Sequence, residues 1–233
     1  MMEEAYIEKI PFVDSRLGRH IVHDPRSRNF TEQIPRLATP LRKVQHRRYD
    51  PRPEPNQAIG CCTAVAECML GNTVGNRVTG KVLGMDLAVI AYGMATSLDP
   101  FQGTYPPDDT GSSGLAAAKA MVKLGFAEDY VWYFSVDEVL RALQFHPISF
   151  GGIWTHDMFN ATWGNPVIRP TGEVAGGHRW LLSGYDPKSN LISGECWWGN
   201  WGRNGRFYIS VQDFGTLLED NGDAHFTRRK MPR

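Results

Sequence analysis

The chain has 233 residues, which is long enough for one large domain or two small lobes around a substantial core. Its 25 lysines and arginines balance 25 aspartates and glutamates, which argues against a dedicated nucleic-acid binder because that class is usually basic. Hydrophobic residues make up 42% of the chain and charged residues 21%, which is typical of a folded globular protein rather than a disordered one.

The cysteines and the apolar segments bear on where the protein works. No stretch approaches the roughly 20 apolar residues of a membrane-spanning helix, and residues 1–6 lack the basic and apolar regions of a secretory signal. Cys61, Cys62 and Cys68 lie close together and Cys196 lies far away, a spacing that suits neither a disulfide framework nor a zinc site. We therefore expect reduced thiols, an intracellular or virion-associated setting, and no membrane, metal or cofactor.

The first 50 residues differ from the rest of the chain. They are interrupted by prolines and show no sustained periodicity, and residues 36–52 carry six basic side chains against one acidic one. We interpret residues 1–50 as an extended arm that either wraps the domain or extends freely, and residues 51–233 as the folded domain.

The front of that domain has helical patterns. They predict a helix from Cys62 onward and further helices over residues 85–96, 115–124 and 136–143. Ser113 is placed to cap the third of these and Gly125 to end it, and Ser135 with Glu138 forms a capping box.

The back of the domain is rich in strand patterns. They cover residues 148–154, 178–185, 191–197 and 206–210, separated by turn residues. The sequence thus predicts an α+β protein with a helical lobe over about residues 51–143 and a β-rich lobe over about residues 144–233.

Three segments contain residue patterns suited to chemistry. Cys62 opens a helix, where the helix dipole favours a thiolate, and Gln57 lies close before it as a donor for a developing oxyanion. His178 opens a strand after two glycines, which permit close approach of a substrate. Residues 195–207 combine tryptophan and glycine at a density that fits either a core cluster or an exposed patch.

In this order, the three segments resemble the papain-like cysteine peptidases, and the resemblance covers about residues 50–233. It implies a helical lobe packed against an antiparallel β-barrel-like lobe, with the active-site cleft between them. It also implies Cys62 as the nucleophile, His178 as the general base and Gln57 as the oxyanion donor, acting on a peptide or protein without a cofactor.

Two positions depart from the family pattern. Gln57 is one residue closer to the cysteine than usual, and the asparagine that orients the histidine is missing. An ungapped match to the Trp-Gly loop puts Glu195 at that position, whereas a match with one deletion puts Cys196 there. Chemistry favours Glu195, because a carboxylate accepts the imidazole N–H well and a thiol is a weak partner.

The resemblance leaves three functions open. The first is a cysteine peptidase that cleaves peptide bonds through a Cys62 thiolate and an acyl-enzyme. The second is a papain-fold amidase that cuts cell-wall peptides. The third is a catalytically degraded scaffold with a binding or structural role, suggested by the missing asparagine, the shortened loop after Gln57 and the unusual arm.

Overall fold

The computed structural model describes residues 14–32, 40–48, 58–74 and 82–229. The helices are α1 (Cys62–Val74), α3 (Met85–Thr96), α4 (Gly114–Lys123), α5 (Val136–Ala142), α6 (Trp201–Asn204) and α7 (Val211–Glu219), with 3-10 helices at Pro25–Asn29 and His156–Asn160. The strands are β1 (Val44–Gln45), β2 (Ala127–Tyr133), β3 (Ile148–Thr155), β4 (Val174–Asp186), β5 (Leu191–Glu195), β6 (Arg206–Ser210) and β7 (Asp223–Arg229). The protein is α+β, as the sequence predicts.

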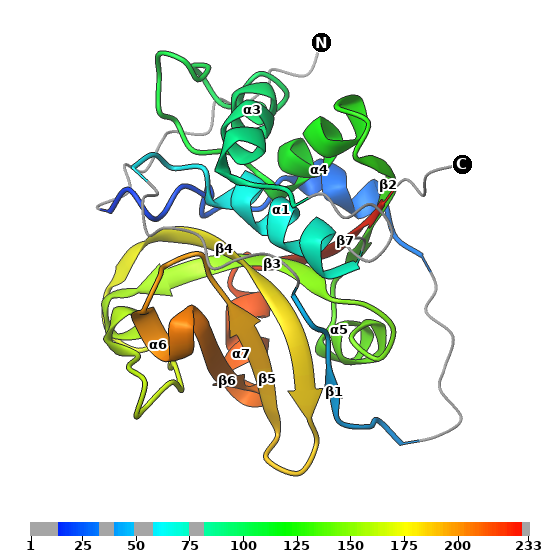
Figure 1. The fold of residues 1–233 in the computed structure, drawn as a ribbon, viewed down its shortest axis with the longest axis vertical. Coiled ribbons are helices and arrows are strands. Elements are labelled where there is room, and N and C mark those ends of the chain that lie inside the picture. The colour runs from blue at the N-terminus through cyan, green and yellow to red at the C-terminus, as the bar shows by residue number, and fades with distance from the viewer. Residues whose placement is uncertain (1–13, 33–39, 49–57, 75–81, 230–233) are drawn as a thin grey trace.

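The molecule has a helical layer and a sheet layer (Figure 1). Helices α1, α3 and α4 pack on one another, and α1 also contacts β4 of the sheet below them. Helices α5, α6 and α7 lie around the sheet. The helical layer and the sheet meet along α1 and β4, the two elements that carry Cys62 and His178.

Local signals set the ends of several helices. Ser113 accepts the Ala116 N–H at 3.2 Å at the start of α4, and Gly125 follows its end with φ of 78°. This positive φ is the left-handed conformation that ends helices and favours glycine. The helix predicted over residues 85–96 coincides with α3.

The sheet is antiparallel and open among the described residues. Its strand order is β2-β7-β3-β4-β5-β6, and β1 pairs with β4. The expected barrel-like closure of this lobe is therefore not formed, because β2 and β6 end the path without pairing with each other. Strand β2 also lies in the part of the sequence assigned to the helical lobe, so the sheet draws on both halves of the chain.

The sequence patterns did not indicate β7. Its alternate residues Asp223, His225 and Thr227 are polar and yet buried, so the strand lacks the usual alternation of apolar and exposed positions. A buried polar side chain needs a hydrogen-bond partner, and these three find theirs on other elements. Arg228 and Arg229 are the last residues of the strand.

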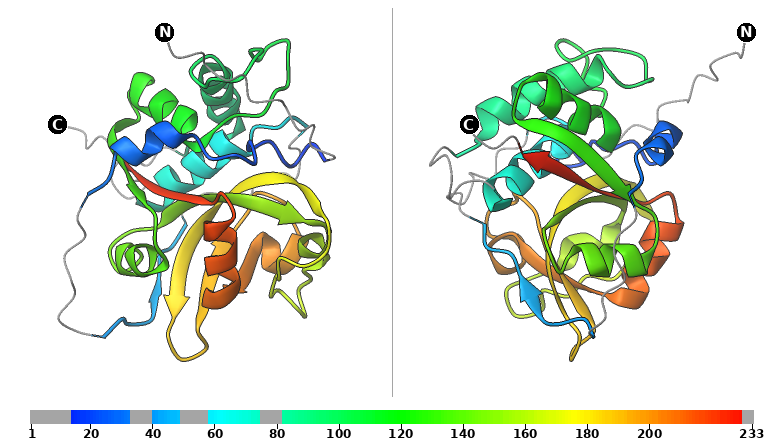
Figure 2. Two further views of the ribbon diagram at one scale, coloured as in Figure 1. Left: turned by 180° about the vertical axis from the view of Figure 1, so that it is seen from behind. Right: turned by 90° about the vertical axis from the view of Figure 1, so that its right-hand side faces the viewer.

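The described parts of the arm pack on the domain. Val44 of β1 pairs with Tyr185 of β4, and the Trp132 N–H donates to the Phe30 carbonyl at 2.7 Å. Residues 14–21, which we call the crossing segment, run between the helical layer and the sheet; they are the dark blue trace in Figures 1 and 2.

The four cysteines are free thiols. In the part of the chain that the structure describes, no helix is both long and apolar enough to span a membrane.

The capping box at α5 generates a stability prediction. Ser135 Oγ accepts the Glu138 N–H at 3.2 Å, and Glu138 Oε2 accepts the Ser135 N–H at 3.0 Å. We expect Ser135→Ala to lower the free energy of unfolding by about 1 kcal/mol, because a helix N–H loses its acceptor. Denaturant unfolding measures this, with Ser189→Ala in an exposed turn as the control. Equal destabilisation of both variants would contradict the prediction.

Candidate active site

Cys62 is the first residue of α1 and is completely buried. The loop before it is fixed by Asp109, whose carboxylate accepts the Gly60 N–H at 3.0 and 3.1 Å and the Tyr92 hydroxyl at 2.5 Å. Burial raises the pKa of the Cys62 thiol to about 12, although hydrogen bonding to the Arg179 backbone and the Arg179 charge act in the opposite direction. Cys62 is therefore a neutral thiol at pH 7 in this arrangement.

His178 lies within β4 and is only 2% exposed. Its ring is enclosed by Trp154, Trp180 and Trp198, at centroid distances of 5.1, 5.9 and 4.5 Å. Burial lowers the pKa of His178 to about 3, and the charge of Arg16 acts in the same direction. The imidazole is thus neutral at pH 7, which is the form that a general base requires.

Cys196 rather than Glu195 contacts the imidazole. The Cys196 Sγ lies 3.4 Å from His178 Nε2. Glu195 is paired with Arg206 at 2.8 Å and with Arg48 at 3.2 Å. The expected contact between Glu195 and His178 is therefore corrected to one between Cys196 and His178.

The alternation of side chains along the strands explains this correction. Glu195 pairs with Leu181 of β4, and paired residues point to the same face of a sheet. His178 precedes Leu181 by an odd number of positions, so its side chain points to the opposite face. The next residue after Glu195 is Cys196, which is turned toward His178.

The crossing segment is hydrogen-bonded to both layers. The N–H groups of Gly18 and Arg19 donate to the Gly177 carbonyl, each at 3.1 Å. The Ser112 N–H, from the loop before α4, donates to the Gly18 carbonyl at 2.8 Å. The segment is thus held between the residue before His178 and the helical layer.

Glycines make this close approach feasible. A Cβ at Gly18 would lie 2.0 Å from the Gly60 carbonyl oxygen, and one at Gly177 would lie 2.2 Å from the Arg19 carbonyl oxygen. Backbone therefore packs directly on backbone at both positions. The glycine that precedes His178 serves here to admit the crossing segment.

Arg16 completes the cover over His178. Its guanidinium pairs with Asp14 at 2.6 Å and lies over the rings of Phe159 and Trp198, 4.6 and 5.0 Å from their centroids. Both Cys62 and His178 are consequently closed off from solvent.

The remaining candidates have different outcomes. Gln57 lies outside the described residues. Trp197 and Trp198 are buried, and Trp201 Nε1 donates to the Phe159 carbonyl at 2.8 Å, so the tryptophan loop is a core cluster rather than an exposed patch. Among the residues that the structure describes, no group of histidines, cysteines and carboxylates is arranged to hold a metal ion.

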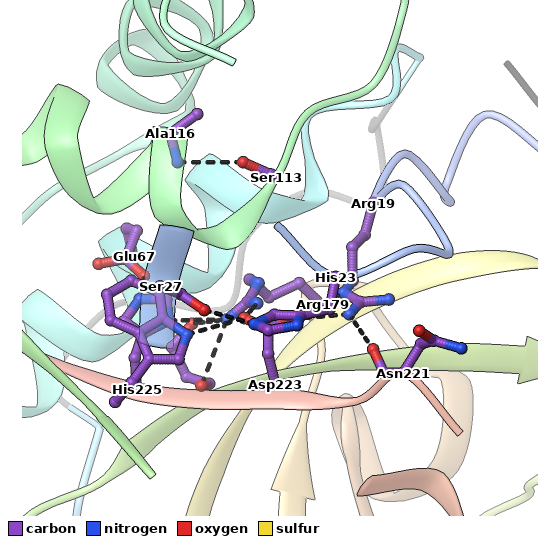
Figure 3. A network of polar contacts seen from close by, with 12 residues as sticks. Arg19, His23, Ser27, Glu67, Ser113, Ala116, Arg179, Asn221, Asp223 and His225 are labelled. Carbon is purple, nitrogen blue, oxygen red and sulfur yellow. Dashed lines mark hydrogen bonds and ion pairs between the residues drawn. The ribbon is translucent and has the colours of Figure 1, made fainter. Parts of the chain in front are cut away.

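A buried charge network adjoins the site, and the sequence patterns did not predict it (Figure 3). Asp223 of β7 binds the guanidiniums of Arg19 and Arg179, at 2.7 Å for Arg19. Arg179 also contacts His225 at 2.9 Å, and His225 contacts Glu67 of α1 at 2.6 Å. One signal was available, because Arg179 is a charged residue within a strand pattern and a buried charge requires a partner.

Comparison with solved structures identifies the fold. Xylellain, a cysteine protease from Xylella fastidiosa, aligns with a TM-score of 0.72 and 16% identity over 95% of this chain and 100% of its own. A procathepsin B from Trypanosoma congolense aligns with a TM-score of 0.70 and 13% identity over 93% and 87%. Bromelain from Ananas comosus, in complex with E64, aligns with a TM-score of 0.59 and 12% identity over 82% and 100%.

The chain therefore has the fold of the papain-like cysteine peptidases. Comparison with protein-family models and with curated protein sequences gave no match.

The cover over Cys62 generates a reactivity prediction. Gly18→Ala places a methyl group against the Gly60 backbone. We expect this clash to displace the crossing segment from its position between the helical layer and the sheet, which makes Cys62 accessible. We expect its alkylation rate near neutral pH to rise by about tenfold or more, because desolvation no longer raises its pKa. Peptide mass mapping after labelling measures this.

The matched control is Gly164→Ala, since a Cβ at Gly164 meets nothing within 4 Å. An equal labelling rate at Cys62 in Gly18→Ala and Gly164→Ala would show that the crossing segment does not limit access.

Proposed function

We propose that the protein is a cysteine peptidase held in a latent form by its own crossing segment. The observation that supports this most directly is the meeting of α1 and β4. Cys62 opens α1 beside the backbone of Arg179, the residue next to His178, and the Cys196 thiol lies 3.4 Å from His178 Nε2. These three residues, from distant parts of the sequence, support an assignment of Cys62 as the nucleophile, His178 as the base and Cys196 as the positioning group.

The proposed reaction follows from these groups. Because Nε2 of His178 is directed to Cys196, Nδ1 is the atom that takes the proton from Cys62. The thiolate attacks the peptide carbonyl, and the Cys62 N–H with the Gln57 amide stabilises the oxyanion. The imidazolium then protonates the leaving amine, and water activated by His178 hydrolyses the acyl-enzyme.

Latency is supported by burial and by the pKa directions. In the closed arrangement the thiol and the imidazole are both neutral, since burial raises the pKa of Cys62 and lowers that of His178. Entry of water or substrate in place of the crossing segment removes part of that penalty and favours the ion pair. Several similar structures are described as pro-forms, among them procathepsin L 3 of Tenebrio molitor larval midgut.

A specific observation favours one alternative function, a scaffold without catalysis. The residue that contacts His178 Nε2 is the thiol of Cys196, which is a weak hydrogen-bond partner. If this contact does not orient the imidazole, the protein has the fold of a cysteine peptidase but does not hydrolyse peptide bonds. A cell-wall amidase remains the other alternative and differs from a general peptidase only in its substrate.

Hydrolysis by the Gly18→Ala variant tests the proposal. We expect this variant to cleave casein faster than the parent chain by about tenfold or more, in step with the exposure of Cys62. Adding Cys62→Ala should abolish cleavage, because no other group supplies the nucleophile. Cys68→Ala, a buried cysteine further along α1, is the matched control and should keep the activity.

Each alternative has its own result. Cleavage by the Cys62→Ala variant at the parent rate would falsify the assignment. Clearance of bacterial cell walls without cleavage of casein would favour the amidase. A folded Gly18→Ala variant that hydrolyses neither substrate would favour the scaffold.

The role of Cys196 generates a further prediction. In the Gly18→Ala background we expect Cys196→Asn to raise turnover by about tenfold, since an amide oxygen accepts an imidazole N–H far better than a thiol does. Cys196→Ala should lower turnover, and Glu195→Gln, which weakens the pairs with Arg206 and Arg48, should mainly lower stability. Steady-state rates and unfolding curves measure both effects; loss of turnover in Glu195→Gln alone would reverse the assignment.

A further inference from the structure

The side chain of Arg19 turns inward from the crossing segment and is bound mainly by residues of the domain. Its Nε and Nη2 donate to Asp223 Oδ1 at 3.0 and 2.7 Å, and Nη2 also donates to the Asn221 carbonyl at 2.6 Å. Its Nη1 donates to the Ile21 carbonyl, the one acceptor among these that belongs to the crossing segment, at 3.0 Å. We call the residues that receive this side chain, Asp223, Asn221 and Gly151, the Arg19 site.

The Arg19 site is shaped for a guanidinium. A Cβ at Gly151 of β3 would lie 2.3 Å from Arg19 Nε and 2.8 Å from Arg179 Nη2, so the glycine leaves the space that both planar groups occupy. Asp223 and the Asn221 carbonyl accept hydrogen bonds from different N–H groups of the same planar guanidinium. The single ammonium group of a lysine cannot reproduce this geometry.

Hydrogen-bond roles determine the charge of His225. Arg179 Nη1 lies 2.9 Å from His225 Nδ1, and because a guanidinium only donates, Nδ1 accepts and carries no proton. The proton is therefore on Nε2, which donates to Glu67 Oε1 at 2.6 Å. Both Glu67 oxygens accept, since Thr227 Oγ1 donates to the other at 2.6 Å. His225 is thus neutral and Glu67 is a carboxylate.

The network balances its charge only while a cation fills the Arg19 site. Burial would raise the pKa of Asp223, but the charges of Arg179 and Arg19 lower it below its ordinary value, so Asp223 is a carboxylate at neutral pH. Two carboxylates, Asp223 and Glu67, then face two guanidiniums, Arg179 and Arg19. When Arg19 leaves, one negative charge is left in excess, and a buried excess charge is strongly unfavourable.

The Arg19 site also lies beside the reacting groups. The Arg19 N–H donates to the carbonyl of Gly177, the residue before His178, and the Arg19 backbone and charge both act on the Cys62 thiol. A peptide residue that replaced Arg19 would thus bring its own backbone to the same position.

We infer that the Arg19 site is a specificity pocket for an arginine side chain of the peptide substrate, which takes the place of Arg19 once the crossing segment has left. This inference rests on the proposed peptidase function for its substrate, whereas the guanidinium-binding site itself does not depend on catalysis.

The test compares an arginyl peptide with its citrulline counterpart. Citrulline has nearly the same shape and carries no charge. Binding of acetyl-arginyl-glycine methylamide and of the citrulline peptide is measured by calorimetry on the full chain carrying Gly18→Ala and Cys62→Ala, so that no turnover intervenes. We expect the arginyl peptide to bind at least about tenfold more tightly than the citrulline peptide, because only the charged guanidinium makes charge-assisted hydrogen bonds to Asp223.

Pocket variants identify the residues responsible. Asp223→Asn should remove the preference for arginine. Gly151→Ala should weaken arginyl binding without changing the charge of the site, because its Cβ occupies the space of the guanidinium. Asp137→Asn, an exposed carboxylate paired with Arg141, is the matched control and should keep the preference. Adding Arg19→Ala to the chain that carries Gly18→Ala and Cys62→Ala removes the competing side chain as well as the covering backbone, and should show the same order of affinities.

The outcomes separate the pocket from the peptidase. No preference for the arginyl peptide in the Gly18→Ala chain, with or without Arg19→Ala, overturns the pocket, whatever the chain cleaves. With Cys62 intact, cleavage that ignores arginine also overturns the pocket and leaves the peptidase standing. Arginine-selective binding without any cleavage supports the pocket and overturns the peptidase.

Discussion

Asp223 holds two guanidiniums in a region from which water is excluded, and the arrangement of the site depends on it. Through Arg19 it fixes the crossing segment, and through Arg179 it fixes β4 beside His178. Arg179 extends the contact through His225 to Glu67 on α1. Because removing one partner from a buried pair costs about 3–5 kcal/mol, loss of any one of these residues weakens the attachment of the others.

Burial shifts the pKa values of Cys62 and His178 in opposite directions. It disfavours whichever form is charged, so it raises the pKa of Cys62 and lowers that of His178. One covering segment therefore removes both the thiolate and the imidazolium at once. The helix N-terminus that should favour a thiolate is still present at Cys62, but desolvation outweighs it while the segment is in place.

What was predictable from the sequence was mostly local. The cap at Ser113, the capping box at Ser135 and the extent of α3 follow from residues within a few positions of each other. The order of cysteine, histidine and tryptophan loop likewise indicated the fold that the similar structures share.

Contacts that join distant residues were not predictable in the same way. The choice between Glu195 and Cys196 depends on the register of β5 against β4, which no local pattern specifies. The burial of His225 depends on Glu67, a partner far away in the sequence. The path of the crossing segment depends on glycines such as Gly18 and Gly60, whose close approach is visible only in three dimensions.

The crossing segment is tethered to the domain that it covers, which has a consequence for concentration. A tethered ligand competes at an effective concentration on the order of millimolar, however dilute the protein is. Dilution alone therefore does not uncover Cys62. A single break in the chain between the crossing segment and α1 would turn the same residues into a separate peptide, whose occupancy would then fall with the amount of protein present.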